Sequence, residues 1–364
     1  MVRYHHALLK EINMVIENLR AEYGDAFVIK TKANGEPYTI VVDGGPYSSR
    51  NEIASYYSEL GRIDLMILTH YDEDHILGLL KYMQMHADKS LPVTRFWGNC
   101  AEGLNLVVRN EISDAGDRNA ATLAAFLKKQ QASNPEFIWQ EDIMSPQSFS
   151  RGDLRIDILS PHPDFHKKFK ASHDAYLKEH PMNDDELIED LNIAARYATD
   201  NAKSIDTLLS EKYTRVVNEY NMDSIAFLLS AEGKRVLMMG DADPDVVAEA
   251  LLAIPGIETP VDIDVVKVSH HGSRNNMSAK FLKMVHCNRF LFSTNGGTRN
   301  SHHPDKLTLA LIARETARTD DETTELLFNY ELDTILQRTK GLLTAEEQKA
   351  EKCTIVPETV TIEI

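Results

Sequence analysis

The sequence has few cysteines, no long apolar run and no apolar leader. Three cysteines, Cys100, Cys287 and Cys353, occur in 364 residues, and none lies in a Cys-x-x-Cys pair. Cysteines this few and this widely spaced argue against a disulfide framework and favour a reducing compartment. We therefore expect all three to pack as small hydrophobic residues. No run of about 18 apolar residues is present, and residues 1–10 lack the stretch of a secretory signal, so we expect a cytoplasmic protein with no membrane partner.

The sequence also has fewer basic than acidic residues. The chain has 39 Lys and Arg against 56 Asp and Glu, which gives a formal net charge of −17. A strongly acidic surface repels nucleic acid unless a local basic patch compensates. This disfavours binding of long duplexes, but nucleic acid in short single strands and small phosphodiesters remain open as substrates. The hydrophobic fraction of 43% is enough for a large core, in one domain or two.

The sequence does contain a dense group of metal-ligand side chains between a predicted strand and a predicted helix. The apolar run 65–68 indicates a buried strand, and an apolar helix is predicted over 75–86. Four donors lie between or at their ends: His70, Asp72, Asp74 and His75. Either aspartate alone could simply cap the helix. Together, however, carboxylates and imidazoles are the ligands that divalent ions take, and they would be costly to bury unpaired, so the group predicts a metal site.

The stretch Thr69–His75 resembles the His-x-His-x-Asp-His signature of the metallo-β-lactamase fold, with Asp72 at the position of the second histidine. In this form it is similar to the hydrolase domain of the DNA-uptake channel proteins of competent bacteria and to its stand-alone relatives. The resemblance covers most of residues 12–310. It implies an α/β (α+β) protein with the αββα sandwich, in which two mixed sheets pack face to face, helices lie outside, and the site lies where strand-end loops converge.

Later motifs agree with the same family. They are Asn221 with Ser224 at the start of a predicted hairpin, Gly240-Asp241 after it, the His-His-Gly-Ser stretch 270–273, and His303-Pro304. The first resembles an Asn-x-x-Ser pattern, and the last matches the end of an Asn-x-x-x-His-Pro pattern. A pair of histidines after a strand is weak evidence by itself. In order behind Asp241 and the first donor group, it is much stronger.

The resemblance implies a site for two divalent ions, Zn²⁺ or Mn²⁺. Mg²⁺ is also open, because Asp72 supplies a hard oxygen donor where relatives have an imidazole. The residues expected at the metals are His70, Asp72, Asp74, His75, His162, Asp241 and His271. Asp241 would bridge the two ions, and His162 is either a further ligand or a solvent-exposed loop residue. Two ions about 3.5–4 Å apart acidify a bridging water and stabilise both oxygens of a displacement.

Catalytic roles are expected for Asp74, His270 and His303. Either histidine of the 270–271 pair could be the ligand; we assign His271 to the metal and His270 to the substrate or to ligand orientation. His303 is expected to contact the substrate or donate a proton. Asp43 would support the metal loop from behind, with a plain turn residue as the alternative.

The chain order predicts two similar halves separated by an insertion. The expected parts are a leader at 1–11, the two halves of the fold at 12–163 and 223–317, a helical insertion at 164–222, and a C-terminal extension packed on the fold at 318–364. His166, His173 and His180 in the insertion lack donor neighbours at ligand spacing, so we expect them at the surface. The extension is expected to add edge strands at 325–329 and 359–364.

These observations favour a metal-dependent hydrolase, a phosphodiesterase or nuclease that uses a metal-bridging hydroxide. Its substrate would be a phosphodiester or a small ester. One alternative is a lactone- or thioester-type ester hydrolase on the same fold. Another is a regulatory module that retains the metal site and binds a partner protein through residues 164–222. The fold alone does not decide among them.

Overall fold

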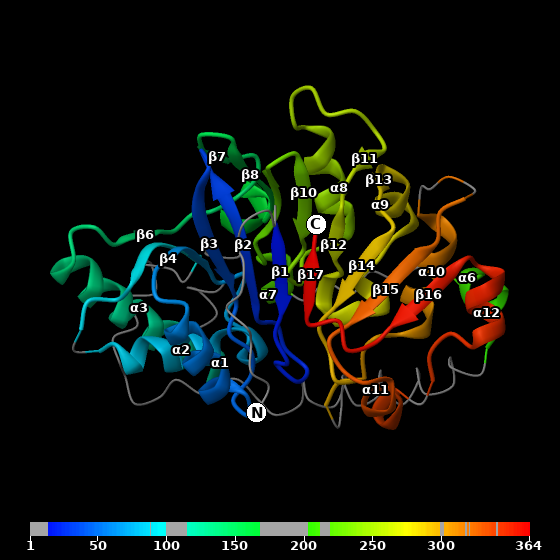
Figure 1. The fold of residues 1–364 in the computed structure, drawn as a ribbon, viewed down its shortest axis with the longest axis horizontal. Coiled ribbons are helices and arrows are strands. Elements are labelled where there is room, and N and C mark those ends of the chain that lie inside the picture. Colours follow the sequence, from blue (N-terminus) through cyan, green and yellow to red (C-terminus); the bar gives the residue numbers. More distant parts are fainter. Residues whose placement is uncertain are drawn as a thin grey trace.

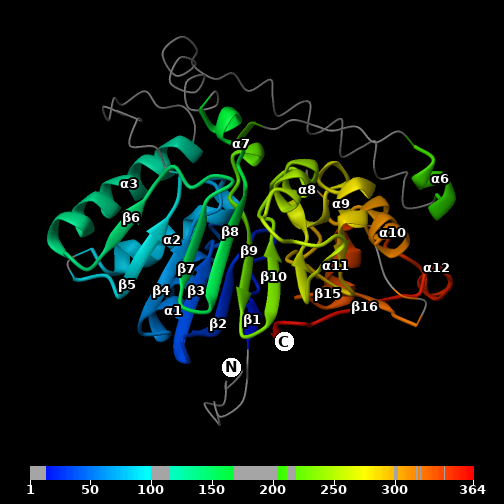
Figure 2. The same ribbon diagram turned by 90° about the horizontal axis from the view of Figure 1, so that it is seen from above.

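The computed structural model describes residues 14–87, 89–99, 115–167, 203–211, 219–298, 302–316, 319, 321–339 and 341–364. Two large mixed sheets lie face to face, and helices cover their outer faces (Figures 1 and 2). The predicted αββα sandwich is therefore confirmed. No helix in these ranges is both long and apolar enough to cross a membrane. The expected leader, Cys100, His173 and His180 lie outside the described residues.

The first sheet has the strand order β17-β1-β2-β3-β4-β5-β6. Its strands are β1 (Val15–Asn18), β2 (Phe27–Ala33), β3 (Glu36–Val42), β4 (Ile63–Ile67), β5 (Val93–Trp97), β6 (Ile138–Gln140) and β17 (Thr361–Glu363). The strands from β3 to β6 are parallel. Their connections carry α1 (Arg50–Glu59), α2 (Glu73–Met85) and α3 (Ala115–Ser133). Parallel strands need such crossovers, and these place the helices on the outer face of the sheet.

The second sheet has the strand order β16-β15-β14-β12-β10-β9-β8-β7. Its strands are β7 (Ser148–Arg151), β8 (Leu154–Ser160), β9 (Ala226–Ala231), β10 (Lys234–Met238), β12 (Val265–Lys267), β14 (Arg289–Phe292), β15 (Thr324–Phe328) and β16 (Cys353–Val356). The strands β10, β12, β14, β15 and β16 are parallel neighbours. Their carboxyl ends therefore meet at one edge of the sheet.

The remaining elements lie around this second sheet. They are α6 (Ile205–Leu209), α7 (Glu219–Met222), α8 (Pro244–Leu252), α9 (Ala279–Met284), α10 (Lys306–Glu315), α11 (Leu332–Thr339), α12 (Ala345–Ala350) and the short pair β11 (Val261–Asp262) and β13 (Val285–His286). The start of α8 follows from its sequence, because Asp243 caps the helix and Pro244 occupies its first turn.

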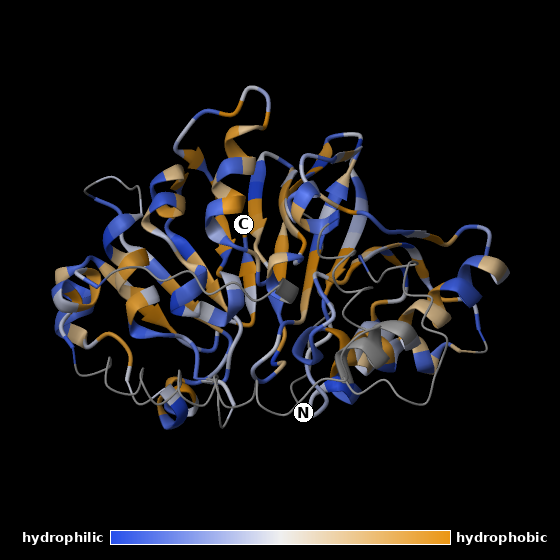
Figure 3. Cartoon of the chain, turned by 180° about the vertical axis from the view of Figure 1, so that it is seen from behind, coloured by the Kyte–Doolittle hydropathy of each residue, from blue (hydrophilic) through white to orange (hydrophobic). Residues whose placement is uncertain are grey.

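The core has three layers of apolar contacts, one between the sheets and one under each helical layer. Strand β4 shows why, because all its residues are buried. Leu65 and Ile67 pack between the sheets, whereas Met66 packs against the helices. Alternate residues of a strand point to opposite faces, so a central strand covered on both faces is mostly apolar, and in β4 only Asp64 is polar. The hydrophobic colouring of Figure 3 is accordingly concentrated in the strands.

Of the two edge strands expected in the C-terminal part, one prediction is wrong and the other is confirmed. The strand expected at an edge near 325–329 is internal, because β15 pairs with β14 on one side and β16 on the other. Its run Leu326–Phe328 is buried, as internal parallel strands are. The second expected edge strand is confirmed as β17, which pairs with β1. Cys287 and Cys353 are buried and free.

Candidate metal centre

The loop between β4 and α2 carries the first group of donors and is held from behind by Asp43. The Thr69 backbone N–H and its hydroxyl donate to the two oxygens of Asp43, each at 2.8 Å. The same carboxylate lies 2.9 Å from His75 Nδ1. Asp43 thus fixes both ends of the loop and leaves His75 Nε2 facing the site, as a carboxylate behind a ligating histidine does.

Two glycines let the Asp43 loop approach α2 closely. A Cβ atom on Gly78 would lie 1.9 Å from the Gly44 carbonyl oxygen, and one on Gly44 would lie 2.3 Å from Leu79 N. The two backbones therefore touch directly. Only glycine allows this approach, and it brings Asp43 within bonding distance of His75.

The second sheet delivers donors from the ends of neighbouring parallel strands. Asp241 follows β10, His270 and His271 follow β12, and His303 follows β14 along the chain. Asp241 Oδ1 lies 3.6 Å from His75 Nε2, and Asp241 Oδ2 lies 3.8 Å from His70 Nε2. His271 Nε2 lies 3.2 Å from Asp74 Oδ2. Residues separated by most of the chain thus meet around one small space.

Two sets of donor atoms in this space have the spacing of metal ligands. His70, His75 and Asp241 form one set and Asp74, His75 and His271 the other, with all donor atoms of a set within 4.8 Å of one another. Donors about 2.1 Å from a shared cation and at a tetrahedral angle lie about 3.4 Å apart. The distances of 3.6 Å and 3.8 Å from Asp241 to His75 and His70 fit that spacing better than direct hydrogen bonding.

The buried donor atoms at the centre lack hydrogen-bond partners. His70 Nε2, His75 Nε2 and Asp241 Oδ1 are buried, and no described residue bonds to them. Buried polar atoms are almost always satisfied, because leaving one unpaired costs about 1–3 kcal/mol. Three such atoms facing one another fit a bound divalent cation.

The protonation states agree with this interpretation. Burial disfavours the charged form of His75, but Asp241 and Asp74 outweigh it and raise its pKa well above the ordinary value. Burial likewise opposes the charged form of His271, while Asp25 and Asp74 raise its pKa to about 10. Without a cation, protons on these imidazoles balance the carboxylates. A metal ion would replace those protons.

A buried ion pair supports His271 from behind. Lys267 at the end of β12 is fully buried, pairs with Asp25 and donates to the Gly240 carbonyl at 3.0 Å. Asp25 Oδ1 lies 3.3 Å from His271 Nδ1, which is also 2.9 Å from the Ser293 carbonyl oxygen. The sequence analysis assigned no role to Lys267. A lysine inside the apolar run 265–268 was the available signal, because lysine is almost never fully buried unless paired.

The two consecutive histidines have left-handed backbone conformations, with φ values of 47° for His270 and 52° for His271. Such residues cost about 1–3 kcal/mol each and persist where their surroundings fix them. His270 Nδ1 lies 3.1 Å from Asn276 Oδ1, and its backbone N–H donates to Gly240 O at 3.0 Å. This turn directs His271 inward toward Asp74 and leaves His270 at the opening.

The structure brings most of the expected site residues together. His70, Asp74, His75, Asp241 and His271 form the two sets described above; Asp72 lies beside them, with Oδ2 3.5 Å from His70 Nε2. His270 Nε2 is 3.7 Å from Asp241 Oδ2, and the His270 and His303 rings are 5.2 Å apart. A pocket of about 170 Å³ opens onto Asp74, His270, His271 and His303.

His162 lies apart from this group. It is exposed, and its Nδ1 accepts a hydrogen bond from the Asp164 backbone N–H at 3.2 Å. It belongs to neither donor set among the described residues. Its position matches the alternative stated for it, a loop residue at the surface.

The expectation that His166 lies at the surface is wrong. Its side chain is buried, with Nδ1 2.6 Å from Asp223 Oδ1 and Nε2 3.3 Å from Asp142 Oδ1. Both carboxylates come from distant parts of the chain. Local spacing, on which the prediction rested, could not reveal them.

Comparisons with known proteins agree with this architecture. Residues 19–93 match the family model of the metallo-β-lactamase superfamily. The chain has the metallo-β-lactamase fold. The donors of both sheets lie at the edge where the strand-end loops meet, which is the position expected from the sequence.

Individual relatives are distant. ComE operon protein 3 of Bacillus subtilis (strain 168) is 26% identical over 98 residues, which is 27% of this chain and only 12% of that protein. YhfI from Bacillus subtilis is 12% identical, with 97% of this chain and 100% of that chain covered and a TM-score of 0.45. Zn²⁺-bound PqqB from Methylobacterium extorquens is 11% identical, with 93% of this chain and 87% of that chain covered and a TM-score of 0.39.

Proposed function

We propose that this protein, with its metallo-β-lactamase fold, is a metal-dependent hydrolase that cleaves phosphodiester bonds with the help of two divalent ions. The observation that carries the proposal is the set of unpartnered buried donor atoms on His70, His75 and Asp241, next to an open pocket. A structural zinc site is usually closed by four protein ligands, whereas a catalytic site keeps an open position. The opening onto solvent therefore favours an enzyme over a regulatory module.

The donor sets support a division of the ligands. His70 and Asp72 would hold one ion, Asp74, His75 and His271 would hold the other, and Asp241 would face both. When bound, two such ions would acidify a water and neutralise charge on the attacked group. The carboxylate of Asp72, where the His-x-His-x-Asp-His signature has an imidazole, adds charge and a hard oxygen donor, which suits Mn²⁺ or Mg²⁺ as well as Zn²⁺.

Two histidines at the opening are suited to proton transfer. Burial lowers the pKa of His270 although Asp241 opposes the shift, so this imidazole is neutral near pH 7 and can accept a proton. His303 Nδ1 lies 3.1 Å from Asp305 Oδ2. When Nδ1–H donates to that carboxylate, His303 presents Nε2 to the substrate. In its imidazolium form, His303 could give the Nε2 proton to the leaving oxygen as a general acid.

The test is hydrolysis of bis-p-nitrophenyl phosphate by protein stripped of metal and reloaded separately with Zn²⁺, Mn²⁺ or Mg²⁺. We expect turnover with more than one of these ions. Activity with Zn²⁺ alone would contradict the role given to Asp72. A lactone assay runs in parallel: turnover of the lactone without turnover of the phosphodiester would overturn the proposed substrate class and favour the ester hydrolase.

A further inference from the structure

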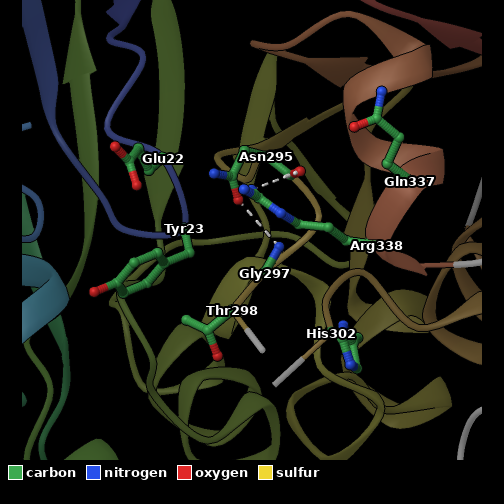
Figure 4. A pocket seen from close by; sticks show the side chains of 8 residues that line it. All are labelled: Glu22, Tyr23, Asn295, Gly297, Thr298, His302, Gln337 and Arg338. Carbon is green, nitrogen blue, oxygen red and sulfur yellow. Dashed lines mark hydrogen bonds between the residues drawn. The ribbon is translucent and has the colours of Figure 1, made fainter. Parts of the chain in front are cut away.

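A second, larger pocket adjoins the opening of the metal centre. It has a volume of about 450 Å³, and Tyr23, Gly297 and Thr298 belong to the walls of both pockets. Its far wall is formed by Arg338 from α11 and by Asn295 from the loop after β14 (Figure 4). A molecule reacting beside Asp74 and His303 can therefore extend past Tyr23 into this space.

We propose that this pocket is a substrate subsite that binds a second phosphate group, one not being cleaved, on the guanidinium of Arg338. The proposal deepens the proposed function and rests on it: the preferred substrate would be a phosphodiester carrying a further terminal phosphate.

Arg338 combines a place on the pocket wall with the absence of an acidic partner. No described carboxylate lies within ion-pair distance of Arg338, whereas Arg155, Arg274 and Arg314 each pair with one. Arg95, Arg235 and Arg289 also lack a described acidic partner, but they do not line the pocket. Its one hydrogen bond within the described part of the chain is long, from Nη1 to the Asn295 carbonyl at 3.4 Å. In a chain with a net charge of −17, a cation left available beside the site is what an anionic substrate group requires.

The wall that carries Arg338 is tightly built. Gly296 has φ of 99°, and a Cβ atom there would lie 2.7 Å from Ile335 O and 3.0 Å from Arg338 Cβ. The loop after β14 therefore packs directly on α11 at the base of the arginine. Asn295 Oδ1 accepts from Gly297 N at 3.2 Å, and Thr294 Oγ1 accepts from Gly296 N at 3.0 Å. These bonds fix the loop, and the close packing holds the backbone end of the Arg338 side chain against it.

The other groups around the pocket suit a single anion at the arginine. Tyr23 has its pKa raised by burial and by Asp74, so its phenol is neutral and can line the path between the two pockets. Glu22 also belongs to the wall, but its carboxylate is directed away from Arg338 in Figure 4. A guanidinium binds phosphate through two parallel hydrogen bonds, which favours phosphate over a neutral group at this wall.

The kinetic test compares the dinucleotide thymidylyl-thymidine with and without a 5′-phosphate on Mn²⁺-loaded protein. We expect the added phosphate to lower KM about ten- to a hundredfold, because a charge-assisted contact is gained, with kcat little changed. Arg338→Gln should abolish this preference. Arg62→Gln is the matched control: it removes the same charge from an exposed residue before β4, at the opposite end of that strand from the site. An Arg338→Gln variant that keeps the preference would overturn the proposal.

A binding measurement separates failure of the subsite from failure of the proposed function. Thymidine 5′-monophosphate and thymidine are titrated calorimetrically into metal-free wild type and Arg338→Gln, where the acidic centre offers no competing phosphate site. We expect tighter binding of the phosphorylated compound to wild type and loss of that difference in the variant. If neither dinucleotide is cleaved, the proposed phosphodiesterase activity is wrong. If wild type and Arg338→Gln then also bind thymidine 5′-monophosphate equally, the proposed subsite is wrong as well.

Discussion

The two sheets contribute to the metal centre in different ways. The first sheet supplies His70, Asp72, Asp74 and His75 from one loop, and a single carboxylate, Asp43, holds that loop from behind. The second sheet supplies the donors Asp241 and His271, and also His303 at the opening, from separate loops after successive strands. These residues are placed by the parallel pairing of β10, β12 and β14, and a buried lysine supports His271 through Asp25. One half of the site is encoded in a short stretch of sequence, and the other half is encoded in the sheet topology.

Asp241 joins the two halves, so its replacement should have the largest effect. Its oxygens face His70 and His75 on one side and His270 on the other. We expect Asp241→Asn to reduce turnover by about a thousandfold and to lower the content of both metal ions, measured by steady-state assay and elemental analysis. Asp243→Asn makes the same charge change two residues away, where the side chain caps α8. This control variant should keep the turnover and the metal content of wild type. Full metal content in the Asp241 variant would contradict a bridging position.

Lys267 and Asp43 support the two halves of the site from behind, and their replacement should have the next largest effects. Lys267→Met breaks the buried ion pair and leaves the Asp25 carboxylate with His271 as its nearest cationic neighbour. We therefore expect a stability loss of about 3–5 kcal/mol and a metal affinity about ten- to a hundredfold lower. Asp43→Asn should weaken metal binding similarly, because it removes the carboxylate behind His75. Chemical denaturation and metal competition measure the two effects.

The double variant Lys267→Met with Asp25→Asn tests whether the lysine acts through that pair. Removing both charges should recover part of the stability lost in Lys267→Met, because no unpaired buried charge remains. No recovery would mean that Lys267 acts through its bond to Gly240 instead.

His303 should affect catalysis without affecting the metals. It lines the opening and lies outside both donor sets. We expect His303→Gln to lower kcat about a hundredfold at normal metal content. Loss of metal from this variant would instead assign His303 to the ligands.

The smallest effect is expected at His166, outside the site. Burial opposes its charged form, but Asp223 and Asp142 raise its pKa above the ordinary value. A raised pKa in the folded state stabilises the protein fully below the unfolded pKa of about 6.5, and this stabilisation is lost as pH rises through the folded pKa. Wild type should therefore lose thermal stability over that range relative to its value at lower pH. His166→Gln should show a weaker dependence, and an unchanged slope would exclude the ion pairs as its source.

The sequence was informative where neighbours along the chain carry the signal. The donor loop 69–75 and the hairpin before Asp241 depend on adjacent residues, and both were predicted. The burial of His166, the internal position of β15 and the pair formed by Lys267 and Asp25 depend on groups brought from elsewhere by the fold. No local pattern specifies such partners. The pocket at Arg338 belongs to this second kind, because its walls come from three separate segments.

The pairing of β17 with β1 sets a condition on how the molecule assembles. Val15 is opposite Glu363, and Ile364 N–H donates to the Met14 carbonyl at 2.9 Å. The first sheet therefore cannot acquire its outermost strand until a segment made much later has returned to it. Closing so long a stretch of chain is slow, which implies that β1 spends time with an unprotected edge during synthesis.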